Sequence, residues 1–347
     1  MKRIIFLGIV LITVIYVAPF LYNEYYDRVI QTVGIGENPP ADGENLSGST
    51  HTDMPSAGAD AVDFGDTITI KAQISGEVRT MGLEEYVAGV VASEISPVFQ
   101  KEALKAQAVA ARTYIVYKLQ NGGNKDARHN GADVCDDYTH CTAYQDIGDP
   151  ALWGDKHEPY RNNIVEAVLA TRGEILEYDG EPIVAVFHAA SSGSTERALD
   201  VWGSDIPYLQ AVSSEGDLDC PEYSGTVTVP AEEFRKKMTE KYPGIYVKGA
   251  PDTWFTASNR SESGGIITAT VGGVEVKGTD IRSLFSLSST NFTLKTTEDS
   301  ITFVTKGYGH GVGLSQYGAE AMAEEGHSYR EILAHYYQNT KIEKFAK

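Results

Sequence analysis

Residues 84–97 read EEYVAGVVASEISP, and residues 105–114 read KAQAVAARTY. Apolar residues recur in both at helical spacing and Pro97 ends the first stretch, so the pattern predicts two helices. Glu94 stands at the end of the first helix beside apolar residues. Burial makes a carboxylate costly to ionise and raises its pKa, as a general acid requires. Glu94 is therefore the first catalytic candidate, and the alternative is an ordinary surface carboxylate at a helix end.

Composition limits the classes of partner. The chain has 347 residues, enough for one large or two modest domains, and a net charge of −19 at pH 7. This charge argues against nucleic acid and against anionic lipid surfaces, because their phosphates would be repelled.

Residues 4–22 carry no charge and are dominated by Ile, Leu, Val and Phe. At about 1.5 Å per residue the run spans roughly 28 Å, close to the hydrocarbon thickness of a bilayer. Two basic residues precede it, so we expect residues 1–22 to form a membrane anchor with its N-terminus in the cytoplasm and the remainder outside. A cleaved signal peptide is the alternative, although 17–19 (Val-Ala-Pro) make a poor cleavage site.

The rest of the chain predicts a linker and a mixed α+β region. Residues 23–64 are rich in Gly, Ser, Pro and Asp and read as a flexible linker. Residues 65–345 alternate strand and helix patterns, with strands dominant at about 200–300. We expect a two-lobed fold, in which a helical lobe carries Glu94 and a β-rich lobe follows. Helices are expected at 102–119, 163–171, 231–241, 314–325 and 328–337.

A loop between the second and third helices holds four possible metal ligands: His129, Cys135, His140 and Cys141. Two thiols and two imidazoles match a closed tetrahedral zinc site, which would be structural because no position stays open for water. A Cys135–Cys141 disulfide is the competing interpretation outside the cytoplasm, and a third is that the histidines are surface residues. Cys220 stands alone and is most simply a buried, inert thiol.

Four stretches together resemble one known family. They are residues 83–114, residues 187–196 (FHAASSGSTE), residues 289–292 (STNF) and residues 307–319 (GYGHGVGLSQYGA). On these motifs the chain resembles the stage II sporulation protein D family, which are membrane-anchored lytic transglycosylases of endospore-forming bacteria. The resemblance spans roughly residues 68–341.

The resemblance implies a function and site residues. It implies that Glu94 is the catalytic acid and base and that Arg112 lies in the active-site groove. Without it, Arg112 could equally pair with an acid such as Glu94 or Glu102. It also favours zinc at the Cys–His cluster, because some clostridial relatives bind a metal in a similar loop. A partner amidase and action during forespore engulfment are further expectations.

A lytic transglycosylase needs only one carboxylate, because the C6 hydroxyl of muramic acid acts as the nucleophile in place of water. The expected substrate is therefore the glycan strand of peptidoglycan. Residues that could line a glycan groove are His188, Ser191, Ser192, Thr195, Tyr308, His310 and Gln316. For the serines, turn-forming or hydrogen-bonding roles are the alternative. A non-catalytic wall-binding or amidase-stimulating protein and a zinc-dependent hydrolase are the rival functions.

Overall fold

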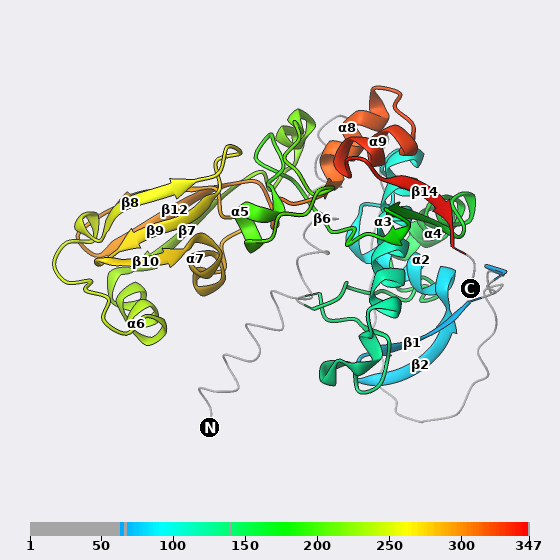
Figure 1. The fold of residues 1–347 in the computed structure, drawn as a ribbon, viewed down its shortest axis with the longest axis horizontal. Helices are drawn as coiled ribbons and strands as arrows, with labels where there is room; N and C mark the ends of the chain where they lie inside the picture. The colour runs from blue at the N-terminus through cyan, green and yellow to red at the C-terminus, as the bar shows by residue number, and fades with distance from the viewer. Residues whose placement is uncertain (1–62, 66–67, 139, 346–347) are drawn as a thin grey trace, which may run out of the picture. The chain divides into compact units, whose positions relative to one another are not determined.

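The computed structural model describes residues 63–65, 68–138 and 140–345 (Figure 1). The predicted membrane anchor lies outside the described residues, as does nearly all of the predicted linker. Within the described ranges, every helix is too short or too polar to cross a bilayer. Helices and mostly antiparallel sheets alternate along the chain, which confirms the predicted α+β class.

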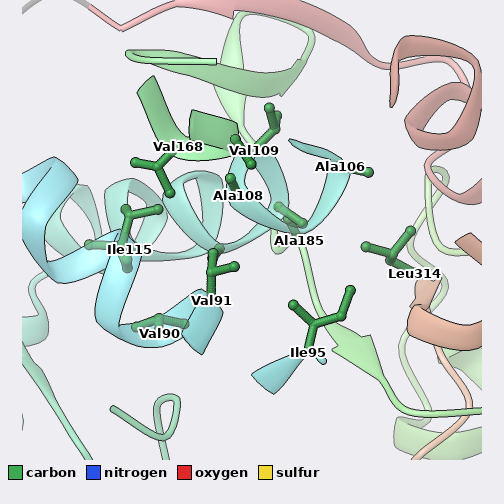
Figure 2. Packing of buried hydrophobic residues seen from close by; sticks show 14 of the residues in the cluster. Val90, Val91, Ile95, Ala106, Ala108, Val109, Ile115, Val168, Ala185 and Leu314 are labelled. Carbon is green, nitrogen blue, oxygen red and sulfur yellow. The ribbon is translucent and has the colours of Figure 1, made fainter. Parts of the chain in front are cut away.

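The first hydrophobic core surrounds the two helices that the opening stretch predicts. They are α2 (Leu83–Glu94) and α3 (Lys101–Gln120), and Figure 2 shows how their side chains meet. Helix α3 is buried on most of its surface because it contacts elements on several sides, namely α2, α4 (His157–Ala170), α8 (Gln316–Glu324), α9 (Tyr329–Tyr336) and β4 (Glu174–Tyr178). The many alanines of α3 permit this crowding, because small side chains let neighbouring backbones approach closely.

Short sheets surround this first core. Strand β1 (Thr69–Ile74) pairs antiparallel with β2 (Glu77–Gly82) and parallel with β3 (Val134–Cys135). Strand β4 lies between β5 (Glu181–Pro182) and β14 (Lys341–Lys344). Strand β6 (Phe187–His188) pairs in parallel with β13 (Leu314–Ser315).

A second hydrophobic core lies further along the chain. One of its sheets has the order β11-β12-β7 and the other has the order β10-β9-β8. The strands are β7 (Ser224–Pro230), β8 (Phe255–Arg260), β9 (Ile266–Val271), β10 (Val274–Lys277), β11 (Phe292–Thr296) and β12 (Ser300–Lys306). Two helices, α6 (Ala231–Lys241) and α7 (Gly278–Phe285), belong to the same part. Phe234 of α6 is central here, because its ring stacks on those of Phe285 and Trp254 at 4.9 and 5.5 Å.

The two cores draw on different parts of the chain. Buried members of the first core come from residues 64–209 and again from 312–337. Those of the second core come from residues 229–303. Where the chain passes from one to the other, the N–H of Gly307 donates to the carbonyl of Tyr223 at 2.7 Å.

The structure departs from the sequence prediction in several short segments. Of the strand expected at 183–188, only β6 forms, because the N–H groups of Ala185 and Val186 donate to the nearby carbonyls of Ile183 and Val184. Helix α7 was not predicted, because the spacing of its few apolar residues fits a short strand as well as a helix. The remaining short elements are α5 (Ala198–Trp202), η1 (Gly123–Lys125), η2 (Ala127–His129), η3 (Gly154–Lys156), η4 (Glu215–Asp219) and η5 (Pro251–Thr253).

Candidate active site and metal centre

Glu94 is the last residue of α2, and its side chain is mostly buried. One carboxylate oxygen accepts a hydrogen bond from the N–H of Ala143 at 3.1 Å. Burial raises the pKa of Glu94 to about 7, and the bond from Ala143 opposes this shift only in part. In the part of the chain that the structure describes, no Lys or Arg forms an ion pair with it. Glu94 can therefore hold a proton near neutral pH, as a general acid must.

The loop that supplies Ala143 packs directly on α2. Gln145 donates its N–H to the carbonyl of Gly89 at 3.1 Å, and the ring of Tyr144 stacks on Tyr86 at 5.2 Å. A Cβ on Gly89 would lie only 2.2 Å from the ring of Tyr144. Glycine at position 89 thus permits the close approach that brings the amide of Ala143 to Glu94.

The four predicted metal ligands come together in the structure. Their ligand atoms, from His129, Cys135, His140 and Cys141, all lie within 4.8 Å of one another. His129 Nε2 is 3.1 Å from His140 Nδ1 and 3.2 Å from Cys141 Sγ, and Cys135 Sγ is 3.4 Å from His140 Nδ1. These separations suit the edges of a small tetrahedron around one ion.

Second-layer contacts orient both imidazoles. His129 Nδ1 donates to the carbonyl of Gly123 at 2.7 Å, and His140 Nε2 lies 3.0 Å from a carboxylate oxygen of Asp126. Metal-binding histidines ordinarily engage their second nitrogen in this way, which leaves the first free for the ion. His129 is fully buried, so the surface-residue interpretation does not hold for it. Cys135 and Cys141 are free thiols. The residues present fit a metal ion.

The cluster and Glu94 are close along the chain. Cys141 precedes Ala143 by two residues, so the loop that the cluster holds is the one that contacts Glu94. Cys220 is outside the cluster and buried, and burial raises the pKa of its thiol to about 12. This agrees with the interpretation of Cys220 as an inert thiol.

Arg112 differs from the expectation that it lines a groove, because it is fully buried. Its Nε donates to both carboxylate oxygens of Glu84 at 2.9 and 3.0 Å. The guanidinium also bonds the carbonyls of Ala108, Val168 and Glu174. Arg112 therefore pairs with an acid, as the alternative interpretation expected, but that acid is Glu84 and not Glu94 or Glu102. Glu84 is buried together with Arg112, as its partner in this ion pair.

Most of the predicted glycan-binding residues hold the backbone in place. His188, Ser191, Thr195 and Gln316 are buried, with exposed fractions of 6% or less. Ser191 donates its N–H to Asp217 at 2.7 Å, and Thr195 accepts the N–H of Val212 at 2.9 Å. Ser192 and His310 are partly buried, and Tyr308 is 47% exposed.

Three of these residues, Ser191, Ser192 and His310, line one small cavity of about 10 Å³. This is roughly the volume that a single water molecule needs, so the cavity is too small for a sugar ring. His188 Nδ1 donates to the carbonyl of Val312 at 3.2 Å, while the N–H of Val312 donates to His310 Nδ1 at 3.0 Å. Burial lowers the pKa of His188 to about 4 and that of His310 to about 3, so both rings are neutral.

Sequence reasoning missed two residues beside the turn formed by residues 307–311. Trp202 of α5 is 45% exposed, and its ring centroid lies 5.4 Å from that of His310. Arg282 of α7 is partly buried, and its Nε donates to the carbonyl of Leu287. Tryptophan is a usable signal because the expected substrate is a glycan, whereas the sequence around Arg282 offered none.

Comparison with known proteins agrees with this arrangement. A family model described as "SpoIID: Stage II sporulation protein" matches residues 72–178, which include α2, α3 and the Cys–His cluster. Stage II sporulation protein D of Bacillus subtilis (strain 168) is 39% identical over 277 residues, covering 80% of this chain and 78% of that protein. The chain belongs to the stage II sporulation protein D family. The Bacillus amyloliquefaciens member is 41% identical over 266 residues, covering 76% of this chain and 75% of its own.

Family membership gives the protein a role in sporulation. A more distant similarity connects it to a protein of another name. The "Amidase enhancer" of Bacillus subtilis (strain 168) is 28% identical over 308 residues, covering 74% of this chain but 40% of that protein.

Proposed function

We propose that the protein is a lytic transglycosylase that cleaves peptidoglycan glycan strands, with Glu94 as the proton carrier. The observation that supports this most directly is the environment of Glu94, a mostly buried carboxylate that has no ion-pair partner among the described residues and has a pKa of about 7. Membership of a sporulation family agrees with action on the cell wall.

The reaction requires two proton transfers through the same carboxyl group. Neutral Glu94 donates its proton to the glycosidic oxygen as the bond from that oxygen to C1 of muramic acid breaks. The carboxylate then removes the proton of the C6 hydroxyl while O6 bonds to C1, closing the 1,6-anhydro ring. Glu94 finishes protonated, so the cycle balances without water. The amide of Ala143 stabilises the carboxylate formed between the two steps.

The test is to digest isolated glycan strands with the purified protein and analyse the products by mass spectrometry. We expect 1,6-anhydro-muramic ends, and we expect Glu94→Gln to lower the rate by a factor of about 10² to 10⁴. Glu85→Gln, an exposed carboxylate on the same helix, is the matched control and should retain activity. Reducing ends would indicate hydrolysis, and full activity of Glu94→Gln would disprove the role of this residue.

A second candidate function is non-catalytic stimulation of an amidase. The similarity to a protein named "Amidase enhancer" favours it. In that case the strands would remain uncut, while the rate of a partner amidase would rise on addition of either wild-type protein or Glu94→Gln. The same digestion with and without amidase therefore separates the two candidates.

We further propose zinc as the ion of the Cys–His cluster, since two thiolates and two imidazoles form a preferred tetrahedral set. All four ligands come from the protein, so the ion would hold the loop and supply no chemistry to the reaction. We also propose that the two cores form two lobes, that residues 1–22 anchor the chain in the membrane, and that the catalytic region lies outside the cytoplasm. The protein would act with a partner amidase during engulfment of the forespore. Metal analysis of the purified protein, with Cys135→Ser as control, tests the zinc assignment.

A further inference from the structure

A row of rings lies beside the turn formed by residues 307–311. The ring centroids of His188 and His310 are 5.5 Å apart, and those of His310 and Trp202 are 5.4 Å apart. Both imidazoles are neutral and bonded to the peptide groups of Val312. Trp202 and Tyr308 remain about half exposed, at 45% and 47%. Trp202 thus offers an exposed aromatic face at one end of the row, and Tyr308 offers an exposed phenolic hydroxyl on the turn itself.

Arg282 reaches the same turn from α7. Its carbonyl accepts the N–H of Leu287 at 2.9 Å, and its Nε donates to the carbonyl of Leu287 at 3.3 Å. The next residue, Ser288, accepts the N–H of Gly309 at 2.9 Å, which connects Arg282 to the turn. Its positive charge also contributes to lowering the pKa of both histidines. Among the described residues, the guanidinium donates through Nε alone, so its two terminal nitrogens remain available to a ligand.

No carboxylate neutralises this guanidinium. Among the residues that the structure describes, no Asp or Glu forms an ion pair with Arg282, although the whole chain carries a net charge of −19. Glu196 also lies at the turn, but its carboxylate accepts the N–H of Gly265 at 3.0 Å. Arg112, by contrast, is fully paired with Glu84. A partly buried guanidinium without a counter-ion is costly to desolvate, and an anionic ligand removes that cost.

We propose that Arg282 and Tyr308 bind the carboxylate of an acidic wall sugar, whose ring packs on Trp202. This inference rests on the proposed function, in that the substrate is a peptidoglycan strand. Muramic acid carries a lactyl group that ends in a carboxylate, whereas N-acetylglucosamine is neutral. A guanidinium binds a carboxylate through paired hydrogen bonds, so Arg282 selects the acidic sugar of the alternating strand. Peptide attached to the lactyl group offers a second source of carboxylate.

The test measures binding by calorimetry with three probes that share one disaccharide. The first is N-acetylglucosaminyl-N-acetylmuramic acid, with a free lactyl carboxylate. The second has this carboxylate converted to a primary amide. The third carries alanyl-isoglutamine on the lactyl group, so that its only carboxylate is on the peptide. We expect the wild-type protein to bind the free acid about tenfold to a hundredfold more tightly than the amide.

Arg282→Gln should remove this preference, and Arg282→Lys should retain part of it. Trp202→Ala should weaken binding of all three probes by a similar factor, because stacking does not depend on the carboxylate. Arg235→Gln is the matched control, since the Nε of Arg235 also donates to a backbone carbonyl, that of Val247 at 2.8 Å. This variant should keep the preference of the wild type. An Arg282-dependent preference for the third probe alone would support carboxylate recognition with the peptide as its source.

The proposal is overturned if Arg282→Gln retains the wild-type ratios among the three probes, or if the wild-type protein binds all three probes equally. Thermal melting shows whether Arg282→Gln is folded. If it is not, Tyr308→Phe replaces it, because removing one exposed hydroxyl leaves the fold intact. We then expect a severalfold loss for the acid and none for the amide, and equal losses would overturn the proposal. Binding requires no cleavage, so these results are independent of whether the protein proves to be a lytic transglycosylase.

Discussion

Two charged residues of the helix pair have opposite surroundings. Glu94 is mostly buried, with one amide donor and no cation beside it in the part of the chain that the structure describes, so its pKa rises. Arg112 is fully buried, but Glu84 neutralises it through two-pronged hydrogen bonding. The first arrangement leaves a proton available for transfer, whereas the second holds α2 and α3 together. Residue type alone does not distinguish these roles, because both residues occupy similar Ala-rich stretches.

The raised pKa of Glu94 has a consequence for stability. Between pH 4.5 and about 7 the folded protein keeps a proton that the unfolded chain has released, so stability falls as the pH rises. The shift corresponds to about 3 kcal/mol. We therefore expect the free energy of unfolding of Glu94→Gln, measured with urea, to rise by about 3 kcal/mol relative to that of the wild type as the pH goes from 4.5 to about 7. If the two proteins differ in free energy of unfolding by the same amount at pH 4 and at pH 8, the raised pKa of Glu94 is contradicted.

Breaking the buried ion pair should cost much more than breaking a surface pair. Arg112→Met leaves Glu84 charged and buried, which we expect to destabilise the protein by about 3–5 kcal/mol. Adding Glu84→Gln should restore part of this loss, because no charge then remains unpaired while the acceptor for the N–H of Gly173 is kept. Lys101→Met, in the exposed pair with Glu166, should change stability by less than about 1 kcal/mol. Denaturant unfolding at pH 7 measures all three, and equal effects of Arg112→Met and Lys101→Met would refute the argument.

At the residue scale, sequence reasoning succeeded where the chemistry is local. His129, Cys135, His140 and Cys141 lie within thirteen residues, and the loop has only to fold back on itself to join them. The partner of Arg112 could not be predicted in the same way, because Glu84 and Arg112 are 28 residues apart and meet only through helix packing. The burial of His188 and Thr195 likewise depends on segments distant in sequence.

At the scale of elements, side chains of one helix complete the ends of another. Glu320 of α8 accepts the N–H of Gln100 at the start of α3, at 2.7 Å. Glu102 of α3 accepts the N–H of Tyr329 at the start of α9, at 2.8 Å. The first N–H groups of a helix have no partner within it, so these bonds fix where α3 and α9 begin. They also join three helices whose sequences are far apart.

The contact between α2 and the following loop can be tested at Gly89. Alanine would stabilise an isolated helix by roughly 0.5–1 kcal/mol relative to glycine. Here its Cβ would meet the ring of Tyr144 at 2.2 Å, so we expect Gly89→Ala to destabilise the protein by about 1–3 kcal/mol instead. Cleavage activity should fall as well, since the amide of Ala143 moves away from Glu94. Thermal melting and product analysis check both, and a smaller loss in a Tyr144→Ala background is expected if the clash is the cause.

Elements with a strong periodic pattern were predicted well. Helices α2, α3, α6 and α9 lie close to their expected ranges, and the capping box of Ser328 and Glu331 marks the start of α9 as expected. Helix α4 begins at His157, earlier than predicted, because η3 leads directly into it. A short element such as β6 depends on pairing with β13, which is distant in the sequence, and this information is not local.

At the scale of the whole molecule, the Cys–His cluster lies in a long loop that has few apolar residues of its own. If it holds the proposed zinc, removing the ion with a chelator should lower the melting temperature by roughly 10 °C, because a tightly held ligand adds several kcal/mol to the folded state. Readdition of zinc should restore it, and magnesium should not. Calorimetry with parallel activity assays measures the effect. Lost activity without a change in melting temperature would mean that the metal is catalytic and not structural.

The pairing of Tyr223 with Gly307 has a consequence for how this chain can be engineered. The segment from 224 to 306 leaves the first core and returns to it at neighbouring points, so it is topologically an insertion. A glycine-rich bridge of a few residues can span the gap, and we expect the shortened chain to keep α2, α3 and the metal-binding capacity proposed for the Cys–His cluster. Far-UV circular dichroism and metal analysis of that shortened protein would show whether the part that holds the first core folds alone. Failure to fold would mean that the inserted module is a required part of it.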